Sequence, residues 1–291
     1  MTYTPGMESL APPPRTIAPL LAVQVMLGGA GAQIGWLLLG FGSIFFWGFA
    51  WNADLSGWRF REDTVARTTG VTLECRQTGL SQGRSSQRQW VYRNLYHYAV
   101  EGRQFQGASF ALERCVFGPV TVEYLRLDPA ISRIAGMRRR PLGPRDTMPA
   151  LVPAIGLGLV IAGLVKGRWR LRLLREGLPA SGRLVEKVVT SSRTNGRADY
   201  RMAFEFTAQN GLTGRASLRT NHPEQLESGS ETLVLYDPAD LSRGLLFRSL
   251  PGNVVIDQQG QPARSGSRAF LFLPLATILG NGWYVYRHWI A

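Results

Sequence analysis

The sequence predicts a membrane protein of mixed class, in which about three transmembrane helices alternate with two small antiparallel β-domains of barrel or sandwich type. Two observations predict this class: three long apolar segments, and a pattern of strands and turns that occurs twice between them. About 20 apolar residues let a helix cross a bilayer, and alternation of apolar with polar residues indicates strands. The predicted order is an N-terminal segment with the first anchor at 1–51, a β-domain at 52–147, a central transmembrane helix at 148–167, a second β-domain at 168–263 and a C-terminal transmembrane helix at 264–291.

The apolar segments carry almost no charge. Ile17 to Trp51 has no charged residue and is longer than one crossing requires, while Met148 to Val165 is uncharged and just reaches spanning length. Ala269 to Ile290 is uncharged up to Arg287 and ends in aromatic residues, which are typical of a membrane interface. Ion-coupled transporters keep ionisable groups at membrane depth, so these uncharged segments argue against transport by this chain alone.

The first apolar segment allows two interpretations. Gly28 to Ala32 interrupts it, so Ile17 to Leu27 could be the apolar part of a signal peptide that is cleaved after Ala30-Gly31-Ala32. We favour an interfacial or re-entrant helix that leads, through a glycine-rich hinge, into a span at Ile34 to Trp51. A membrane anchor remains in either case.

Small residues recur at four-residue spacing within the apolar segments. Such faces let helix backbones approach closely, either within one chain or in a homo-oligomer. Both arrangements stay open. The residues are Gly31 and Gly35, then Ala154, Gly158 and Ala162, then Ala276 and Gly280.

The two β-domains are predicted from ordered landmarks that occur twice. Tyr96-His97-Tyr98 corresponds to Phe204-Glu205-Phe206, and Gly107 corresponds to Gly214. Asp128-Pro129 corresponds to Asp237-Pro238, a separation of 109 residues, which indicates a duplicated domain rather than a short solenoid repeat.

Four strands are expected in each domain, with tight turns at Glu101-Gly102 and Asn210-Gly211. The aromatic residues that alternate along the second strand of each domain share one face. The expected strands are Val71 to Arg76, Trp90 to Val100, Arg103 to Phe110 and Val120 to Leu127 in the first domain, and Arg183 to Thr190, Tyr200 to Ala208, Leu212 to Arg219 and Thr232 to Tyr236 in the second.

Cys75 and Cys115 are the only cysteines, and both belong to the first domain. They can form a disulfide if that domain lies outside the cytoplasm. We favour two unpaired, partly buried thiols, because the geometry of pairing cannot be derived from the sequence.

The chain is strongly basic, with a formal net charge of +13 at pH 7. Basic residues flank the central apolar segment on both sides and predict a collar that contacts anionic lipid headgroups. The denser run follows this segment, which favours a cytoplasmic second domain and an external first domain. No motif for nucleic-acid binding accompanies the charge, so we expect no nucleic-acid partner. The collar residues are Arg138, Arg139, Arg140, Lys166, Arg168, Arg170 and Arg172.

The sequence carries no pattern that assigns catalysis. The three histidines, His97, His222 and His288, lack the spacing of metal ligands, and no nucleophile elbow or phosphate-binding loop is present. We therefore expect no catalytic residue, no cofactor and no metal site.

The combination of anchor and β-domain resembles the bacterial membrane proteins grouped as domain of unknown function 3592, with that domain present in two copies. The resemblance rests on Gln33-Ile34-Gly35-Trp36 followed by Gly40 to Phe45, and on a pattern of glycines and tyrosines that ends at Asp128-Pro129. It covers the anchor and the first copy best. It implies a multi-pass protein of the bacterial inner (cytoplasmic) membrane, and it implies no chemistry, because that family has none assigned. The patterned residues are Gly70, Tyr98, Gly102, Gly107 and Tyr124.

Three functions remain open at this level. The preferred hypothesis is a non-enzymatic scaffold or interaction module whose β-domains bind membrane or envelope proteins, for example by strand addition. The first alternative is a membrane-anchored hydrolase or processing factor that uses dispersed residues such as His97, Glu113 and Asp128. The second alternative is a sensor of anionic lipid or of envelope stress that uses the basic collar.

Overall fold

The computed structural model describes residues 10–83, 87–194, 196–227 and 231–290. The chain forms two compact units, one of Met1–Gly40 with Ile155–Ala291 and the other of Phe41–Ala154. Among the described residues, three helical segments are long and apolar enough to cross a bilayer, which agrees with the predicted number. These segments are Ala30–Asn52, Pro144–Glu176 and Ala269–Trp289.

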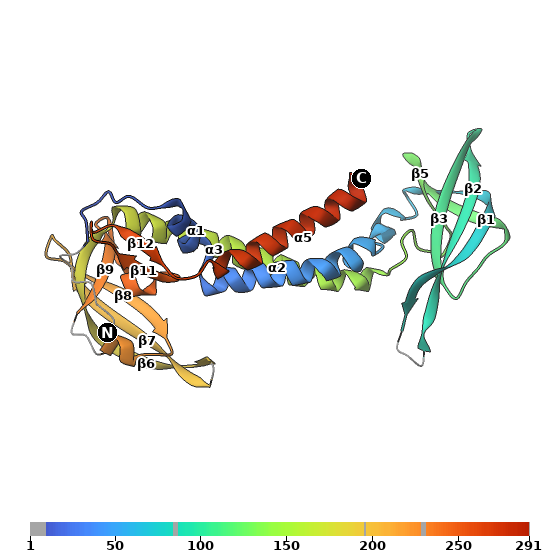
Figure 1. Ribbon diagram of the computed structural model, residues 1–291. Coiled ribbons are helices and arrows are strands. Elements are labelled where there is room, and N and C mark those ends of the chain that lie inside the picture. Colours follow the sequence, from blue (N-terminus) through green and yellow to red (C-terminus); the bar gives the residue numbers. More distant parts are fainter. Residues whose placement is uncertain (1–9, 84–86, 195, 228–230, 291) are drawn as a thin grey trace. The chain divides into compact units, whose positions relative to one another are not determined.

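The helices keep the predicted order along the chain, but two of them differ in length from the prediction (Figure 1). The C-terminal helical segment begins at Ala269 and not at residue 264, which belongs to β12. The central helix does not end at Gly167 but continues through the basic run to Glu176. The α-helices are α1 (Pro19–Leu27), α2 (Ala30–Gly48), α3 (Leu151–Glu176), α4 (Glu224–Glu227) and α5 (Phe272–Trp289). Short 3₁₀ helices are η2 (Ala50–Asn52), η3 (Ser56–Arg59), η5 (Pro144–Ala150), η6 (Phe247–Ser249) and η7 (Ala269–Leu271).

The glycine-rich stretch after Leu27 separates α1 from α2, as the hinge interpretation expects. Gly28 ends α1, whose nine residues are too short to cross a bilayer. Leu21 and Val25 of α1 are fully buried and pack in the same apolar cluster as Leu173 and Leu174 of α3 and residues of the second β-domain. One face of this helix is therefore buried against the rest of the protein.

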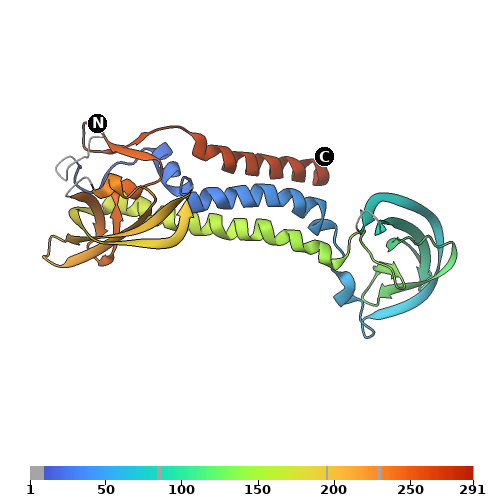
Figure 2. The ribbon, with the colours of Figure 1, turned by 90° about the horizontal axis from the view of Figure 1, so that it is seen from below.

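The first β-domain is a five-stranded antiparallel sheet in the order β3-β2-β1-β4-β5. The fifth strand was not predicted from the sequence. The sheet curves round, as Figure 2 shows, and Phe110 at the end of β3 exchanges two backbone hydrogen bonds with Arg138, which follows β5. The strands are β1 (Val65–Gln82), β2 (Gln89–Val100), β3 (Arg103–Leu112), β4 (Gly118–Leu125) and β5 (Asp128–Ile134).

The second β-domain is a closed five-stranded barrel in the order β10-β8-β7-β6-β9. It is mixed rather than wholly antiparallel, because β10 meets β8 in parallel at Gly244 and Ala216. A small hairpin of β11 and β12 follows the barrel. The strands are β6 (Leu178–Thr194), β7 (Arg197–Thr207), β8 (Thr213–Thr220), β9 (Thr232–Asp237), β10 (Asp240–Leu246), β11 (Asn253–Ile256) and β12 (Pro262–Ser265).

The first strands of the two domains pair in equivalent registers, which agrees with the predicted duplication and corrects its alignment. Gly70 pairs with Tyr98 and Gly182 with Phe206, as the predicted correspondence of their strands requires. Numbers of equivalent residues differ by 112 along the first strand, and this difference also relates the starts of β5 and β10, at Asp128 and Asp240. The predicted equivalence of Asp128 with Asp237 is therefore wrong.

The alternating aromatic residues form the core of each domain. Tyr96 and Tyr98 are buried in the first domain, and Phe204 and Phe206 are buried in the second, each pair on one face of its strand. The hydroxyl groups of Tyr96 and Ser132 are hydrogen-bonded at 2.9 Å, so the polar end of the buried tyrosine is satisfied.

Small residues bring α2 and α3 together, but not all the predicted ones take part. A Cβ atom at Gly35 would lie 2.9 Å from the backbone oxygen of Gly156, and one at Gly163 would lie 2.6 Å from the Cβ of Ala32. Gly31 and Gly158 would meet nothing within 4 Å. The contact face of α3 is therefore the Gly156 face, and the predicted Gly158 face points away from α2.

Cys75 on β1 and Cys115 after β3 form a disulfide, with a Cα–Cα distance of 5.8 Å. The favoured expectation of two unpaired thiols is therefore wrong. Asn94, which pairs with Cys75 in the sheet, accepts a hydrogen bond from the Val116 backbone at 3.0 Å. This contact helps to bring the loop after β3 close to the strand, which the sequence could not reveal.

Candidate functional site

The three arginines before the central helix make contacts within the first β-domain. Arg138 donates from Nη1 to Oε1 of Gln82 at 3.2 Å, and Arg139 donates from Nε to the Ser132 carbonyl at 3.1 Å. Arg140 donates to the backbone carbonyl of Trp51. These side chains link the sheet to the segments that join it to the membrane helices.

The four basic collar residues after the central apolar segment lie on the last turns of α3, on two faces of the helix. Arg172 forms ion pairs with Glu176 at 3.4 Å and with Asp237 at 3.7 Å. Lys166 and Arg170 are four residues apart and therefore share the other face. That face lines a cleft between α3 and the barrel.

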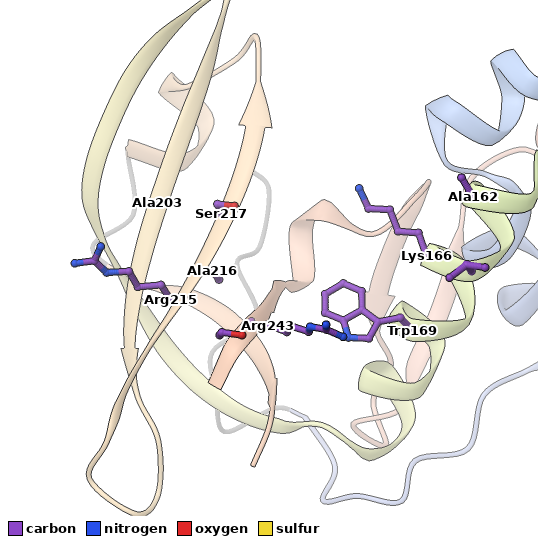
Figure 3. Close-up of a pocket in the computed structure, with 11 residues that line it drawn as sticks. Ala162, Lys166, Trp169, Ala203, Arg215, Ala216, Ser217 and Arg243 are labelled. Atoms are coloured by element: carbon purple, nitrogen blue, oxygen red, sulfur yellow. The ribbon is translucent and has the colours of Figure 1, made fainter. Parts of the chain in front are cut away.

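The cleft consists of two adjoining cavities of about 830 and 660 Å³. Both cavities are lined by Lys166 and Trp169 of α3 and by Ser217 of β8. Figure 3 shows Lys166 and Trp169 projecting from α3 into the larger cavity, whereas the guanidinium of Arg215 turns away from the helix. The barrel wall of the cleft is the outer face of β7, β8 and β10.

The alternation of side chains along the barrel strands places these groups. Met202 and Phe204 of β7 point into the barrel core, so their neighbours Arg201 and Ala203 face outward. Arg201 pairs directly with Arg219 of β8 in the antiparallel register. Two arginines thus lie opposite each other at the cleft, an arrangement that is destabilising unless an anion or a carboxylate neutralises it.

The lining of the cleft is cationic. Six of its residues carry a positive charge, and none of its described lining residues is acidic. Arg215 and Arg243 have carboxylate partners in Glu205 and Asp240. Within the part of the chain that the structure describes, Lys166, Arg170, Arg201 and Arg219 form no ion pair. The six residues are Lys166, Arg170, Arg201, Arg215, Arg219 and Arg243.

Apart from the cleft, each β-domain contains a strand with one free edge. β1 pairs with β4 only up to Thr72, and β6 pairs with β9 only up to Gly182. Beyond those points each strand has a partner on one side only, among the residues that the structure describes. Val188 and Val189 lie on the free stretch of β6 and are 46% and 59% exposed.

The residues of the hydrolase alternative are not brought into contact. Glu113 accepts a hydrogen bond from the Trp90 backbone, Asp128 accepts one from the Ala130 backbone, and His97 lies in the middle of β2. No hydrogen bond or ion pair joins any two of these three described residues. Each carboxylate has a local structural role instead.

No family model matches the chain, and comparisons with curated proteins and with solved structures give no match. The resemblance to domain of unknown function 3592 therefore stays a prediction. No group of three or more metal-ligating side chains is found among the described residues.

The sequence indicated the basic end of α3, but it missed the barrel half of the cleft. Arg201, Arg219 and Arg243 are scattered along the chain, and only the closed barrel brings them to one side. A signal was present in the alternation along β7 and β8, where Met202 and Phe204 inward imply Arg201 outward. The strand order that joins β10 to β8 had no signal in the sequence.

Proposed function

We propose that this chain is a non-enzymatic, multi-pass protein of the bacterial inner membrane whose two β-domains bind extended segments of partner proteins by strand addition. The observation that carries the proposal is that β1 and β6 each have a free edge at the equivalent place in their own domain. A duplicated feature of this kind, present at the same place in both copies, favours a common use of the two domains.

The physical basis is the unsatisfied backbone of an edge strand. N–H and C=O groups along the free stretch can pair with an added strand, and neighbouring aliphatic side chains can pack on it. Leu73 in β1 and Val185 in β6 occupy equivalent bulges and are 54% and 49% exposed. Bulges twist an edge and limit the length that can pair, so a short partner segment fits best.

The test uses the full-length tagged protein in cells, with crosslinking followed by purification in mild detergent and mass spectrometry. Lysine on an edge strand blocks strand addition, so Val188→Lys combined with Val189→Lys should lower the yield of a crosslinked partner about tenfold. Leu212→Lys is the matched control, because Leu212 is 59% exposed in the same domain but lies off the free edge.

Strand addition would be contradicted if the yield of crosslinked partner stayed unchanged both in Val188→Lys with Val189→Lys and in Leu73→Lys of the first domain. An equal loss with the Leu212 control would indicate a general effect of charge on the domain. The hydrolase alternative receives no support from the positions of His97, Glu113 and Asp128 described above.

A further inference from the structure

Binding of partner proteins at the strand edges does not explain the cationic cleft between α3 and the barrel. The cleft is distinct from the free edges of β1 and β6, so its role stands or falls independently of the proposed strand addition. We propose that this cleft binds the phosphate-bearing headgroup of an anionic membrane lipid.

The first argument is the excess of positive charge. Arg201 and Arg219 lie opposite each other on paired strands, and Lys166 and Arg170 face them from the helix. These four side chains have no carboxylate partner in the described part of the chain. A bound phosphate would accept hydrogen bonds from several of them and would remove the repulsion between like charges.

The second argument is an unsatisfied donor. Nε of Arg170 is buried and has no hydrogen-bond partner among the described residues. A buried donor that stays unpaired is costly, and native proteins satisfy nearly all such groups. Arg170 lines the smaller cavity, so an anion bound there can accept this bond.

The third argument is the depth of the cleft along the membrane helix. Ala162 and Val165 line one end of the larger cavity and belong to the uncharged part of α3, whereas Lys166 is the first charged residue after it. Trp169 lies one turn beyond Lys166 and also lines both cavities, and tryptophan is enriched at the level of lipid headgroups. An acyl chain beside Ala162 and a phosphate beside Lys166 match this gradient, whereas a free phosphate would use only the charged end.

The cleft makes a sharper claim than a diffuse basic collar. If net charge alone attracted anionic lipid, removal of any basic residue near the membrane would weaken lipid binding by the same amount. A built cleft responds only to the cations that line it. Lys166 and Arg170 line it, and Arg168 and Arg172 do not, although both pairs lie four residues apart on the same helix.

The experiment measures binding of soluble short-chain lipids to the full-length protein in a neutral detergent. Dioctanoyl phosphatidylglycerol is the anionic probe, dioctanoyl phosphatidylcholine the net-neutral probe, and glycerol 3-phosphate and inorganic phosphate the probes without acyl chains. We expect Lys166→Gln with Arg170→Gln to weaken phosphatidylglycerol binding at least tenfold. The matched pair Arg168→Gln with Arg172→Gln should change it less than about twofold.

Two further variants keep the result interpretable if the first pair disturbs folding. Arg219→Gln removes a cleft cation from an exposed strand position and should also weaken phosphatidylglycerol binding. Ala162→Trp fills the apolar end and should weaken binding of the lipid while leaving glycerol 3-phosphate unaffected.

Three outcomes would overturn the proposal. An equal loss of phosphatidylglycerol binding in Lys166→Gln with Arg170→Gln and in Arg168→Gln with Arg172→Gln would assign the binding to a diffuse collar. Equal binding of phosphatidylcholine would remove the requirement for net anionic charge. Glycerol 3-phosphate or inorganic phosphate binding as tightly as phosphatidylglycerol would identify a soluble anion, not a lipid, as the ligand.

Discussion

At the scale of single residues, Asp54 gives the first β-domain a dependence on pH. Its carboxylate accepts hydrogen bonds from the Ser56 backbone at 2.8 Å and from the Arg139 backbone at 2.7 Å. Burial alone would raise the pKa of Asp54, but these bonds, with others from the Ser56 hydroxyl and the Arg140 backbone, lower it below its usual value. A lowered folded-state pKa means that the ionised group stabilises the fold above about pH 4.

We therefore predict that this contribution is lost as the pH falls through the lowered pKa of Asp54. Asp54→Asn should lower the free energy of unfolding by about 1–3 kcal/mol at pH 7, because its amide nitrogen cannot accept a bond from Arg139. The two proteins should converge in acid. Thermal unfolding of the full-length protein in detergent between pH 2.5 and 7 measures this, with the exposed Asp63→Asn as control. If the melting temperatures of wild type and Asp54→Asn differed by the same amount at every pH, the ionised Asp54 carboxylate would not be the source of this stability.

Arg15 illustrates what the sequence could not predict about single residues. In the sequence it is one positive charge before an apolar stretch. In the structure it is 2% exposed, and its Nη1 donates to the carbonyls of Leu174 at 3.1 Å and Gly177 at 2.9 Å, at the end of α3. Cations are favoured there because the last carbonyls of a helix are unpaired and carry partial negative charge. These two carbonyls are about 160 residues away in the chain, so no local pattern could indicate this role.

At the scale of elements, local patterns were sufficient where a strand has one buried face. The alternation of Tyr96 with Tyr98, and of Phe204 with Phe206, correctly predicted the second strand of each domain and its inward face. The position of β10 was harder to predict from the sequence. Asp237-Pro238 matches Asp128-Pro129 in sequence, but backbone pairing makes Asp240 the true equivalent. Two aspartates three residues apart offered two alignments, and only the register distinguishes them.

The packing of α2 on α3 leads to a prediction that separates two glycine faces. Gly156→Ala should place its Cβ against the Leu39 backbone nitrogen and 2.9 Å from the Gly35 carbonyl oxygen, so the helices must move apart, at a cost of about 1–3 kcal/mol. Gly158→Ala meets nothing within 4 Å and should leave stability unchanged or slightly raised, because alanine favours helix. Melting temperatures of the two variants in the same detergent measure the difference. Equal melting temperatures would contradict this contact face.

At the scale of the whole molecule, each crossing of the membrane reverses the side on which the chain continues. Three crossings would place the first β-domain on one side and the second on the other. Two observations favour an external first domain. It contains the disulfide between Cys75 and Cys115, which is typical of an oxidising compartment, and the denser basic run precedes the second domain.

This orientation predicts which introduced cysteines react in spheroplasts. Leu127→Cys in the first domain should react with a membrane-impermeant maleimide, whereas Leu212→Cys in the second should react only after detergent is added. Both leucines are exposed, so burial within a domain does not explain a difference between them. The opposite pattern would reverse the orientation and place the disulfide in the cytoplasm. Equal reaction at both positions before detergent would mean that α3 does not cross, and the gradient from Ala162 to Lys166 would then need another explanation than the edge of a bilayer.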